Sequence, residues 1–166
     1  ESACRGGPKR QIKSAMHPVI PVLQLLHALE RIEGRKKLQK TVYILKELGA
    51  PFGERFEYSY YGMYSAQLKG ELDALEREGF VSEREIQSGM HPSYMVESAA
   101  KLKILLEDLH LAAPPKWIET ARRLNGLSAQ MLEGISTILF LRRTETDPAA
   151  IRQRLLSLKP HLASVA

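Results

Sequence analysis

A helix with a narrow apolar seam, closed by a glycine, constrains the fold of this chain more than any other feature. Ser65 is a residue type that favours the N-cap of a helix, and the helical pattern runs on to about Phe80. Three leucines at helical spacing form the seam: Leu68, Leu72 and Leu75. Gly79 then permits a turn. We therefore expect an amphipathic helix that packs its seam on other helices.

The segment after this helix predicts a two-stranded β-hairpin. Residues 81–86 and 94–97 have the composition of strands. The loop between them carries Ser88-Gly89 and His91-Pro92-Ser93, which favour turns and are too polar for a core. A helix followed by such a hairpin is typical of the last helix and the wing of a winged helix-turn-helix module.

Helical periodicity accounts for most of the remaining chain. Helices are expected over residues 17–32, 35–48, 65–80, 99–110, 114–126, 128–143 and from 147 onward. The alternation over 56–60 predicts a short strand, and the helix over 128–143 is so apolar that we expect it to be the central buried one. The predicted fold is mainly α with a small β-hairpin (α+β). A winged-helix-like module over 16–97 is followed by a C-terminal helical extension over 98–166 that packs on it.

Residues 1–15 differ in composition from the rest of the chain. They contain Gly6-Gly7-Pro8 and scattered charges, and Met16 follows directly. Our hypothesis is that Met16 is the natural start and that residues 1–15 are a flexible leader or tag. The single cysteine, Cys4, has no partner for an intrachain disulfide, which suits a reducing compartment. No apolar stretch approaches the roughly 18 residues that span a bilayer, so we expect a cytoplasmic protein without a membrane partner.

The net charge does not by itself indicate nucleic-acid binding. The chain carries a formal charge of +5. Four basic residues and one acidic residue within 1–15 supply +3 of it, which leaves +2 for residues 16–166. A folded body with so small an excess of positive charge is not strongly basic. Any nucleic-acid site must therefore depend on particular residues rather than on the overall charge.

Three motifs resemble the YwgA family of small bacterial proteins. They are Gly34-Arg-Lys-Lys-Leu-Gln-Lys-Thr-Val-Tyr43, Tyr60-Tyr-Gly-Met-Tyr-Ser65, and Leu72-Asp-Ala-Leu75 followed by Gly79. The resemblance is sharp over 34–81 and looser up to about Arg143. The chain is also distantly similar to the Panacea (SocA-like) domain, although Gly62-Met63 stands where that domain favours Gly-Pro. Panacea-type proteins are regarded as antitoxins or proteolytic adaptors, so this second resemblance implies protein binding.

The residues that usually carry catalysis are not arranged for it. The five histidines lie at positions 17, 27, 91, 110 and 161, without metal-ligand spacing and without a Cys/His cluster. Gly126-Leu127-Ser128 lacks the second glycine of a nucleophile elbow, and Ser128 is better interpreted as a helix cap. The carboxylates between Lys69 and Glu78 alternate with basic residues, as on a solvated helix face. We expect no enzymatic activity, no cofactor and no metal.

One functional hypothesis is DNA binding by a transcriptional regulator. The helix over 65–79 would enter the major groove, and the hairpin tip over 86–94 would contact the backbone. The candidate contacts are Arg35, Lys36, Lys37, Lys40, Gln67, Lys69, Arg77 and Arg84. Charge opposes this hypothesis, because residues 65–80 and residues 81–97 each carry a net charge of −2. The expected binding is weak and sensitive to salt.

The alternative hypothesis is a protein-interaction module, either antitoxin-like or a proteolytic adaptor. The candidate interface is an aromatic cluster: Phe56, Tyr58, Tyr60, Tyr61 and Tyr64. Such aromatics serve equally often as core. Leu158, Leu162 and Val165 at the tail could dock on a second copy in a homodimer. The sequence leaves DNA and protein partners near even odds, with a slight preference for a DNA-binding winged-helix regulator.

Overall fold

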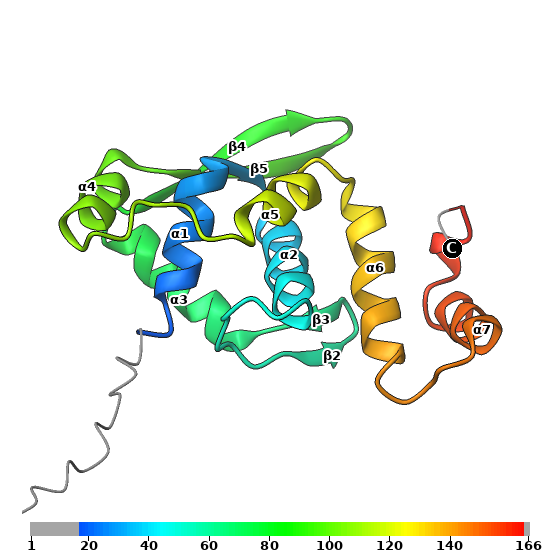
Figure 1. The fold of residues 1–166 in the computed structure, drawn as a ribbon. Coiled ribbons are helices and arrows are strands. Elements are labelled where there is room, and N and C mark those ends of the chain that lie inside the picture. Colours follow the sequence, from blue (N-terminus) through cyan, green and yellow to red (C-terminus); the bar gives the residue numbers. More distant parts are fainter. Residues whose placement is uncertain (1–16, 165–166) are drawn as a thin grey trace, which may run out of the picture.

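The computed structural model describes residues 17–164 and has a mixed α/β fold (Figure 1). The helices of this range are α1 (Ile20–Leu29), α2 (Arg35–Glu47), α3 (Ala66–Arg77), α4 (Ala100–Asp108), α5 (Ile118–Asn125), α6 (Ala129–Leu141) and α7 (Pro148–Leu158), with a short 3-10 turn at Pro160–Leu162. The strands are β1 (Arg31–Glu33), β2 (Glu57–Ser59), β3 (Gly62–Tyr64), β4 (Val81–Ser88) and β5 (His91–Ser98). The postulated leader over 1–15, Met16 and Val165 lie outside the described residues.

The central helix is α2, with every residue from Leu38 to Leu45 buried (Figure 1). The expectation that the helix over 128–143 would be the central one is wrong. The apolar side chains of α6 serve two separate interfaces, which explains its composition. Leu132 packs into the main core, whereas Leu141 packs into a small second core with α7. An almost wholly apolar helix can thus lie between two packed groups rather than in the middle of one.

The first helix ends earlier than its periodicity predicts. It stops at Leu29, and Glu30 adopts a positive φ of 61° that turns the chain into β1. Ile32, expected on the helix, is a buried strand residue opposite Val96 of β5. The helical interpretation of Ile32 is wrong because its strand conformation comes from pairing with a segment distant in sequence.

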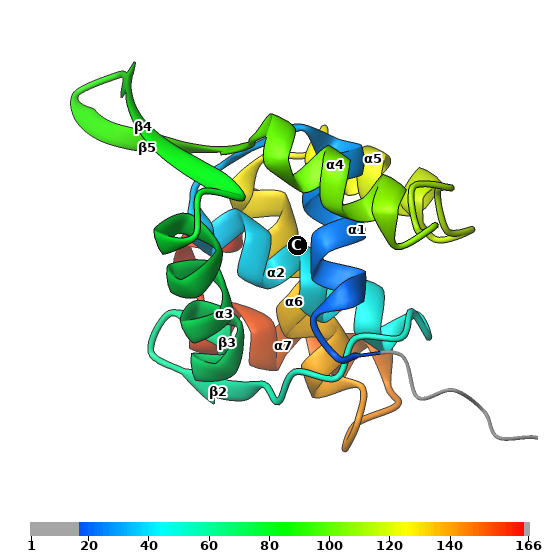
Figure 2. The same ribbon diagram turned by 90° about the vertical axis from the view of Figure 1, so that its left-hand side faces the viewer.

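The predicted hairpin is confirmed and is longer than expected. Strands β4 and β5 pair from Val81 opposite Ser98 to Ser88 opposite His91. Together with β1 they form an antiparallel sheet of order β1-β5-β4. The base of the hairpin joins the core, and the rest projects from the helical body (Figure 2).

The helix with the leucine seam is also confirmed. The Ser65 hydroxyl accepts a hydrogen bond from the Leu68 N–H (3.1 Å), as an N-cap should. The helix ends at Arg77, and Gly79 takes a φ of 75° in the turn that follows. The three seam leucines are buried against the rest of the core.

The short strand predicted over 56–60 is present as β2, and it has a partner that the sequence did not indicate. Strand β3 pairs with β2 across a tight turn, with Ser59 opposite Gly62. Gly62 has a φ of 88°, which a glycine adopts without strain. Tyr60 and Tyr61 therefore form the tip of a second hairpin between α2 and α3.

The C-terminal segment continues the fold rather than standing apart from it. Residues of α4 and α6, such as Leu102 and Leu132, belong to the same core as α1 to α3. Helix α7 is capped by Asp147, whose carboxylate accepts hydrogen bonds from two backbone N–H groups. Among the described residues, no helix is long and apolar enough to cross a membrane.

Candidate functional site

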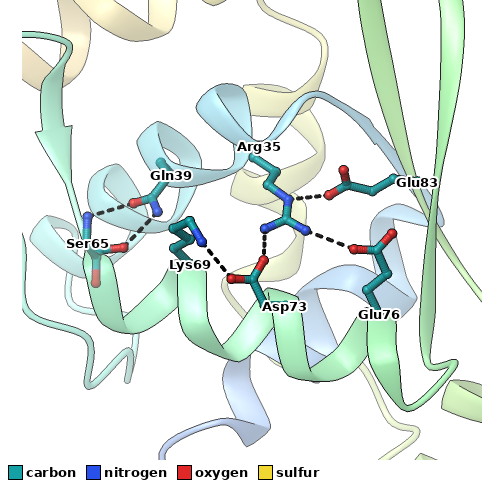
Figure 3. Close-up of polar contacts among 7 residues, drawn as sticks. All are labelled: Arg35, Gln39, Ser65, Lys69, Asp73, Glu76 and Glu83. Carbon is teal, nitrogen blue, oxygen red and sulfur yellow. Dashed lines mark hydrogen bonds and ion pairs between the residues drawn. The ribbon is translucent and has the colours of Figure 1, made fainter.

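Arg35, the first predicted nucleic-acid contact, lies in a cluster of carboxylates (Figure 3). Its guanidinium, at the first turn of α2, binds Asp73 and Glu76 of α3 and Glu83 of β4; the Nη2–Oε2 distance to Glu76 is 3.1 Å. Burial lowers the pKa of Arg35, but hydrogen bonds and charges from Asp73 and Glu83 outweigh it and raise this pKa. The cluster holds α2, α3 and β4 together and leaves Arg35 with little charge to offer a ligand.

Other predicted contacts on α3 and β4 are also engaged by neighbouring carboxylates. Lys69 Nζ lies 2.7 Å from an oxygen of Asp73, and Arg84 Nη2 lies 2.8 Å from an oxygen of Glu97. Hydrogen bonds from Lys69 and then Arg35 lower the pKa of Asp73 to about 2.

Two other predicted nucleic-acid contacts on α3, Gln67 and Arg77, are exposed. The Gln67 side chain donates to Glu71 over 3.1 Å. Arg77 is exposed and makes no salt bridge among residues 17–164. The face formed by α3 and the β4–β5 hairpin thus offers few unpaired cations.

Of the three predicted lysine contacts on α2, Lys37 points away from Lys36 and Lys40, because successive residues on a helix are rotated by about 100° and residues four apart share a face. Lys37 Nζ donates to the backbone carbonyl of Asn125 over 2.6 Å. Lys36 Nζ lies 4.8 Å from the ring centre of Tyr61 in a cation–π contact. Lys40 is buried and lies beneath the Tyr60–Tyr61 turn. The structure thus brings Lys36 and Lys40 together with the aromatic cluster, and not with Lys37.

The aromatic cluster divides between the core and the surface. Phe56 packs on Tyr43 at 5.3 Å between ring centres, and Tyr58 stacks on Phe140 at 4.7 Å. At the tip of the β2–β3 hairpin, Tyr60 is 88% exposed and Tyr61 is 63% exposed.

The exposed tyrosines form one surface with part of β3. The Tyr60 and Tyr61 rings meet edge to face at 5.2 Å. Tyr64 is 37% exposed on β3. The surface part of the cluster is therefore Tyr60, Tyr61 and Tyr64.

Two buried lysines hold the Tyr60–Tyr61 turn from beneath. Lys159 Nζ donates to the Tyr60 carbonyl over 3.1 Å, and Lys40 Nζ donates to the Tyr61 carbonyl over 3.4 Å. Each lysine is only 7% exposed. The turn is thereby tied to α2 and to the segment after α7, so its two rings are presented from a fixed backbone.

Lys159 belongs to an ionic group that the sequence reasoning missed. Its Nζ lies 3.0 Å from Glu133 Oε1 of α6, and His161 Nε2 lies 3.1 Å from the other oxygen. Burial would raise the pKa of Glu133, but hydrogen bonds from Lys159 and His161 outweigh it and lower this pKa. Burial lowers the pKa of Lys40; the charge of Glu133 opposes this lowering, and the charges of Lys159 and Lys36 add to it.

Two clefts lie on either side of Tyr61. The first, which we call the lysine cleft, has a volume of about 530 Å³ and is lined mainly by Lys36, Lys40, Tyr58, Tyr60, Tyr61, Glu133, Lys159 and His161. The second, the apolar cleft, has a volume of about 190 Å³ and is bounded by Gln39, Met63, Tyr64 and Leu72, by the carboxylate-bound cations Arg35 and Lys69, and by the shared residues Lys36, Lys40 and Tyr61. The first can receive an anionic group, and the second an aliphatic side chain.

A larger cleft of about 880 Å³ lies beside the first turn of α2, between the β4–β5 hairpin and the turn before α6. Its basic lining is Arg35, Lys36 and Lys37. Arg35 is bound by carboxylates and Lys37 by a backbone carbonyl, whereas Lys36 contacts the Tyr61 ring and also lines the lysine cleft. Lys36 is therefore the one basic residue of this lining without a hydrogen bond or salt bridge among the described residues.

A buried carboxyl pair lies apart from these clefts. Glu54 is fully buried, and neither of its carboxyl oxygens has a partner in the described structure. Burial and then the charge of neighbouring Glu71 raise the pKa of Glu54 to about 7. Among residues 17–164, no group of three or more Asp, Glu, His or Cys side chains is arranged to hold a metal ion. Glu54 can therefore hold a proton at neutral pH.

A curated protein resembles this chain over most of its length. The chain is 32% identical over 118 residues to the uncharacterized protein YwgA of Bacillus subtilis (strain 168), covering 70% of this chain and 69% of that protein. No family model and no solved structure matches the chain. The more distant similarity to the Panacea domain stays a prediction.

Proposed function

This chain belongs to the YwgA family, and we propose that it is a non-enzymatic regulator of winged-helix type that binds a protein partner at the Tyr60–Tyr61 turn. One observation carries the proposal: two aromatic rings stand in solvent on a turn that two buried lysines hold in place. Exposed aromatic rings gain nothing from the folded core, whereas rigid aromatic anchors dominate many protein interfaces.

The order of elements supports a winged-helix module. Helices α2 and α3 follow α1 and β1, and the β4–β5 hairpin follows α3, with β1 added to the sheet beside β5. In this arrangement the β2–β3 hairpin is an insertion between the two helices of the helix-turn-helix. Such an insertion adds a binding surface without disturbing the core that the leucine seam forms.

DNA binding is the second candidate, because the same module serves transcriptional regulators. The charges of α3 and the β4–β5 hairpin weigh against it. Arg35, Lys69 and Arg84 neutralise nearby carboxylates and cannot release phosphate counterions without giving up those bonds. Lys36 and Arg77 are the exposed candidates without a salt bridge among the described residues. A protein partner is therefore favoured.

Photo-cross-linking in living cells tests the proposal. A benzoyl-phenylalanine placed at Tyr60 should give a discrete adduct in the cytoplasmic fraction that protease destroys and nuclease leaves intact. The matched control is the same group at Tyr94, which is 49% exposed on the β4–β5 hairpin and should give no such adduct. An adduct of twice the chain mass would identify the partner as a second copy. Nuclease-sensitive adducts at Tyr94 or Arg77, with none at Tyr60, would establish DNA binding instead.

A further inference from the structure

The lysine cleft contains more positive charge than its own carboxylate can balance. Its lining holds three lysines, Lys36, Lys40 and Lys159, against one glutamate, Glu133. Glu133 is already shared between Lys159 and His161. The cleft therefore has an excess positive charge that an anionic group could neutralise.

Lys40 is the less satisfied of the two buried lysines of this cleft. An ammonium group has three N–H donors, and among the described residues Lys40 uses one, in a long hydrogen bond of 3.4 Å to the Tyr61 carbonyl. The side chain is 93% buried, so water replaces the missing partners poorly. A carboxylate that entered the cleft would give this buried charge the partner it lacks.

The apolar cleft on the other side of Tyr61 favours an apolar group rather than an anion. Met63 and Leu72, both almost fully buried, form part of its lining, and the rings of Tyr61 and Tyr64 border it. Its volume of about 190 Å³ is below the roughly 300 Å³ of a typical small-molecule site. It suits a single aliphatic side chain.

We propose that the protein partner presents an extended segment in which a carboxylate enters the lysine cleft and an aliphatic side chain, two residues away, enters the apolar cleft. In an extended chain such residues lie on the same face about 7 Å apart, and the two clefts share Lys36, Lys40 and Tyr61 as their common wall. The proposal rests on the function proposed above, because it uses the same turn. The expected partner therefore contains a peptide segment with acidic and aliphatic residues.

Fluorescence anisotropy at low salt with a short labelled peptide that repeats Glu-Ser-Leu-Ser tests this proposal. Saturable binding is expected for this peptide, and binding about tenfold weaker when leucine is replaced by serine. A peptide with lysine in place of glutamate should not bind. Equal binding of all three peptides would overturn the proposal, as would tighter binding of single-stranded oligothymidylate or inorganic phosphate.

Variants of the chain locate the binding. Lys40→Met and the exposed-site variant Lys36→Gln should each weaken binding of the Glu-Ser-Leu-Ser peptide, Lys40→Met by about tenfold. Lys36→Gln keeps the test valid if Lys40→Met unfolds. The matched control is Lys103→Gln on α4, where the one salt bridge of Lys103 within residues 17–164 is with Glu107 at 3.8 Å, and it should bind like the unchanged chain. Equal losses in Lys36→Gln and Lys103→Gln would contradict the assigned cleft.

The two proposals fail in different ways. A protein adduct at Tyr60 without any binding of the Glu-Ser-Leu-Ser peptide would reject the partner chemistry and leave the interaction function standing. Peptide binding that depends on Lys36, with only nuclease-sensitive adducts in cells, would reject the function while retaining the anion-binding cleft.

Discussion

Gln39 of α2 and Ser65, the N-cap of α3, exchange two buried hydrogen bonds (Figure 3). The Gln39 amide donates to the Ser65 carbonyl over 2.9 Å, and the Ser65 N–H donates to Gln39 Oε1 over 2.8 Å. The Ser65 hydroxyl at the same time caps α3. One side chain therefore sets the start of α3 against α2, which also fixes the end of the β2–β3 hairpin and the wall of the apolar cleft.

Replacing Gln39 by leucine should destabilise the fold strongly. The change leaves the Ser65 N–H buried without an acceptor, while the Ser65 carbonyl keeps its hydrogen bond from the Lys69 N–H. We expect a cost of about 1–3 kcal/mol in the free energy of unfolding. Urea denaturation measures this value. Gln153→Leu is the control, because Gln153 is exposed on α7, and it should change the value by less than about 0.5 kcal/mol. Equal losses in Gln39→Leu and Gln153→Leu would show that the Gln39–Ser65 hydrogen bonds do not stabilise the fold.

The Arg35 cluster predicts a second, salt-dependent effect. Arg35→Met leaves three carboxylates close together without their shared cation, so we expect a loss of roughly 1–3 kcal/mol at low ionic strength and a smaller loss at high salt. Arg84→Met removes an isolated surface pair with Glu97 and should cost clearly less than Arg35→Met. A salt-independent loss, or equal losses in the two variants, would contradict the role given to Arg35.

Features encoded by neighbouring residues could be predicted from the sequence. The cap at Ser65 and the leucine seam of α3 are local, and their prediction was correct because capping and periodicity act within one or two turns. The conformation of Ile32 was not predictable in this way. Its strand depends on pairing with β5, and a short apolar segment does not reveal a partner so distant in sequence.

The candidate site was predictable only where its residues lie close together in the sequence. The sequence singled out Tyr60, Tyr61, Lys36 and Lys40, which lie within two adjacent motifs. Lys159, which holds the turn from the other end of the chain, carries no local signal, since a lysine after a helix is most often solvated. Sequence also could not show that Arg35 is neutralised, because its partners lie on α3 and β4.

The buried Glu54 predicts a pH-dependent stability. Its pKa in the folded chain is raised to about 7 from an ordinary value of 4.5, chiefly by burial and then by Glu71, against the opposing charge of Lys46. The stabilisation is fully present below the unfolded pKa of 4.5 and is lost as the pH rises through about 7. We expect the free energy of unfolding to fall by about 2–3 kcal/mol between about pH 5 and about pH 8.

Glu54→Gln isolates this effect. The amide mimics the protonated acid, so the fall in stability between about pH 5 and about pH 8 should largely disappear in urea denaturation. Glu57→Gln, at an exposed position of β2, should keep the fall. The low pKa of Asp73 changes stability only at lower pH and does not disturb the comparison. An unchanged pH profile in Glu54→Gln would disprove the assignment.

Binding to duplex DNA should be weak at low salt and should vanish near physiological salt. If Lys36 and Arg77 are the cations that reach phosphates, the logarithm of affinity should fall with the logarithm of salt concentration with a slope no steeper than about −2. Arg77→Gln should reduce the slope, whereas Arg35→Met should leave it unchanged. Gel-shift titration measures the slope for the unchanged chain and for both variants. A steep slope in the unchanged chain would make DNA the favoured partner.

Hydrogen exchange of the complex formed with the partner that cross-linking identifies shows directly whether the Tyr60–Tyr61 turn is the binding surface. We expect protection of residues 57–64 and 158–161, which form the Tyr60–Tyr61 turn and the segment that holds it, with little change over 81–98. Protection confined to α3 and residues 81–98, with the Tyr60–Tyr61 turn exchanging as in the free chain, would contradict it.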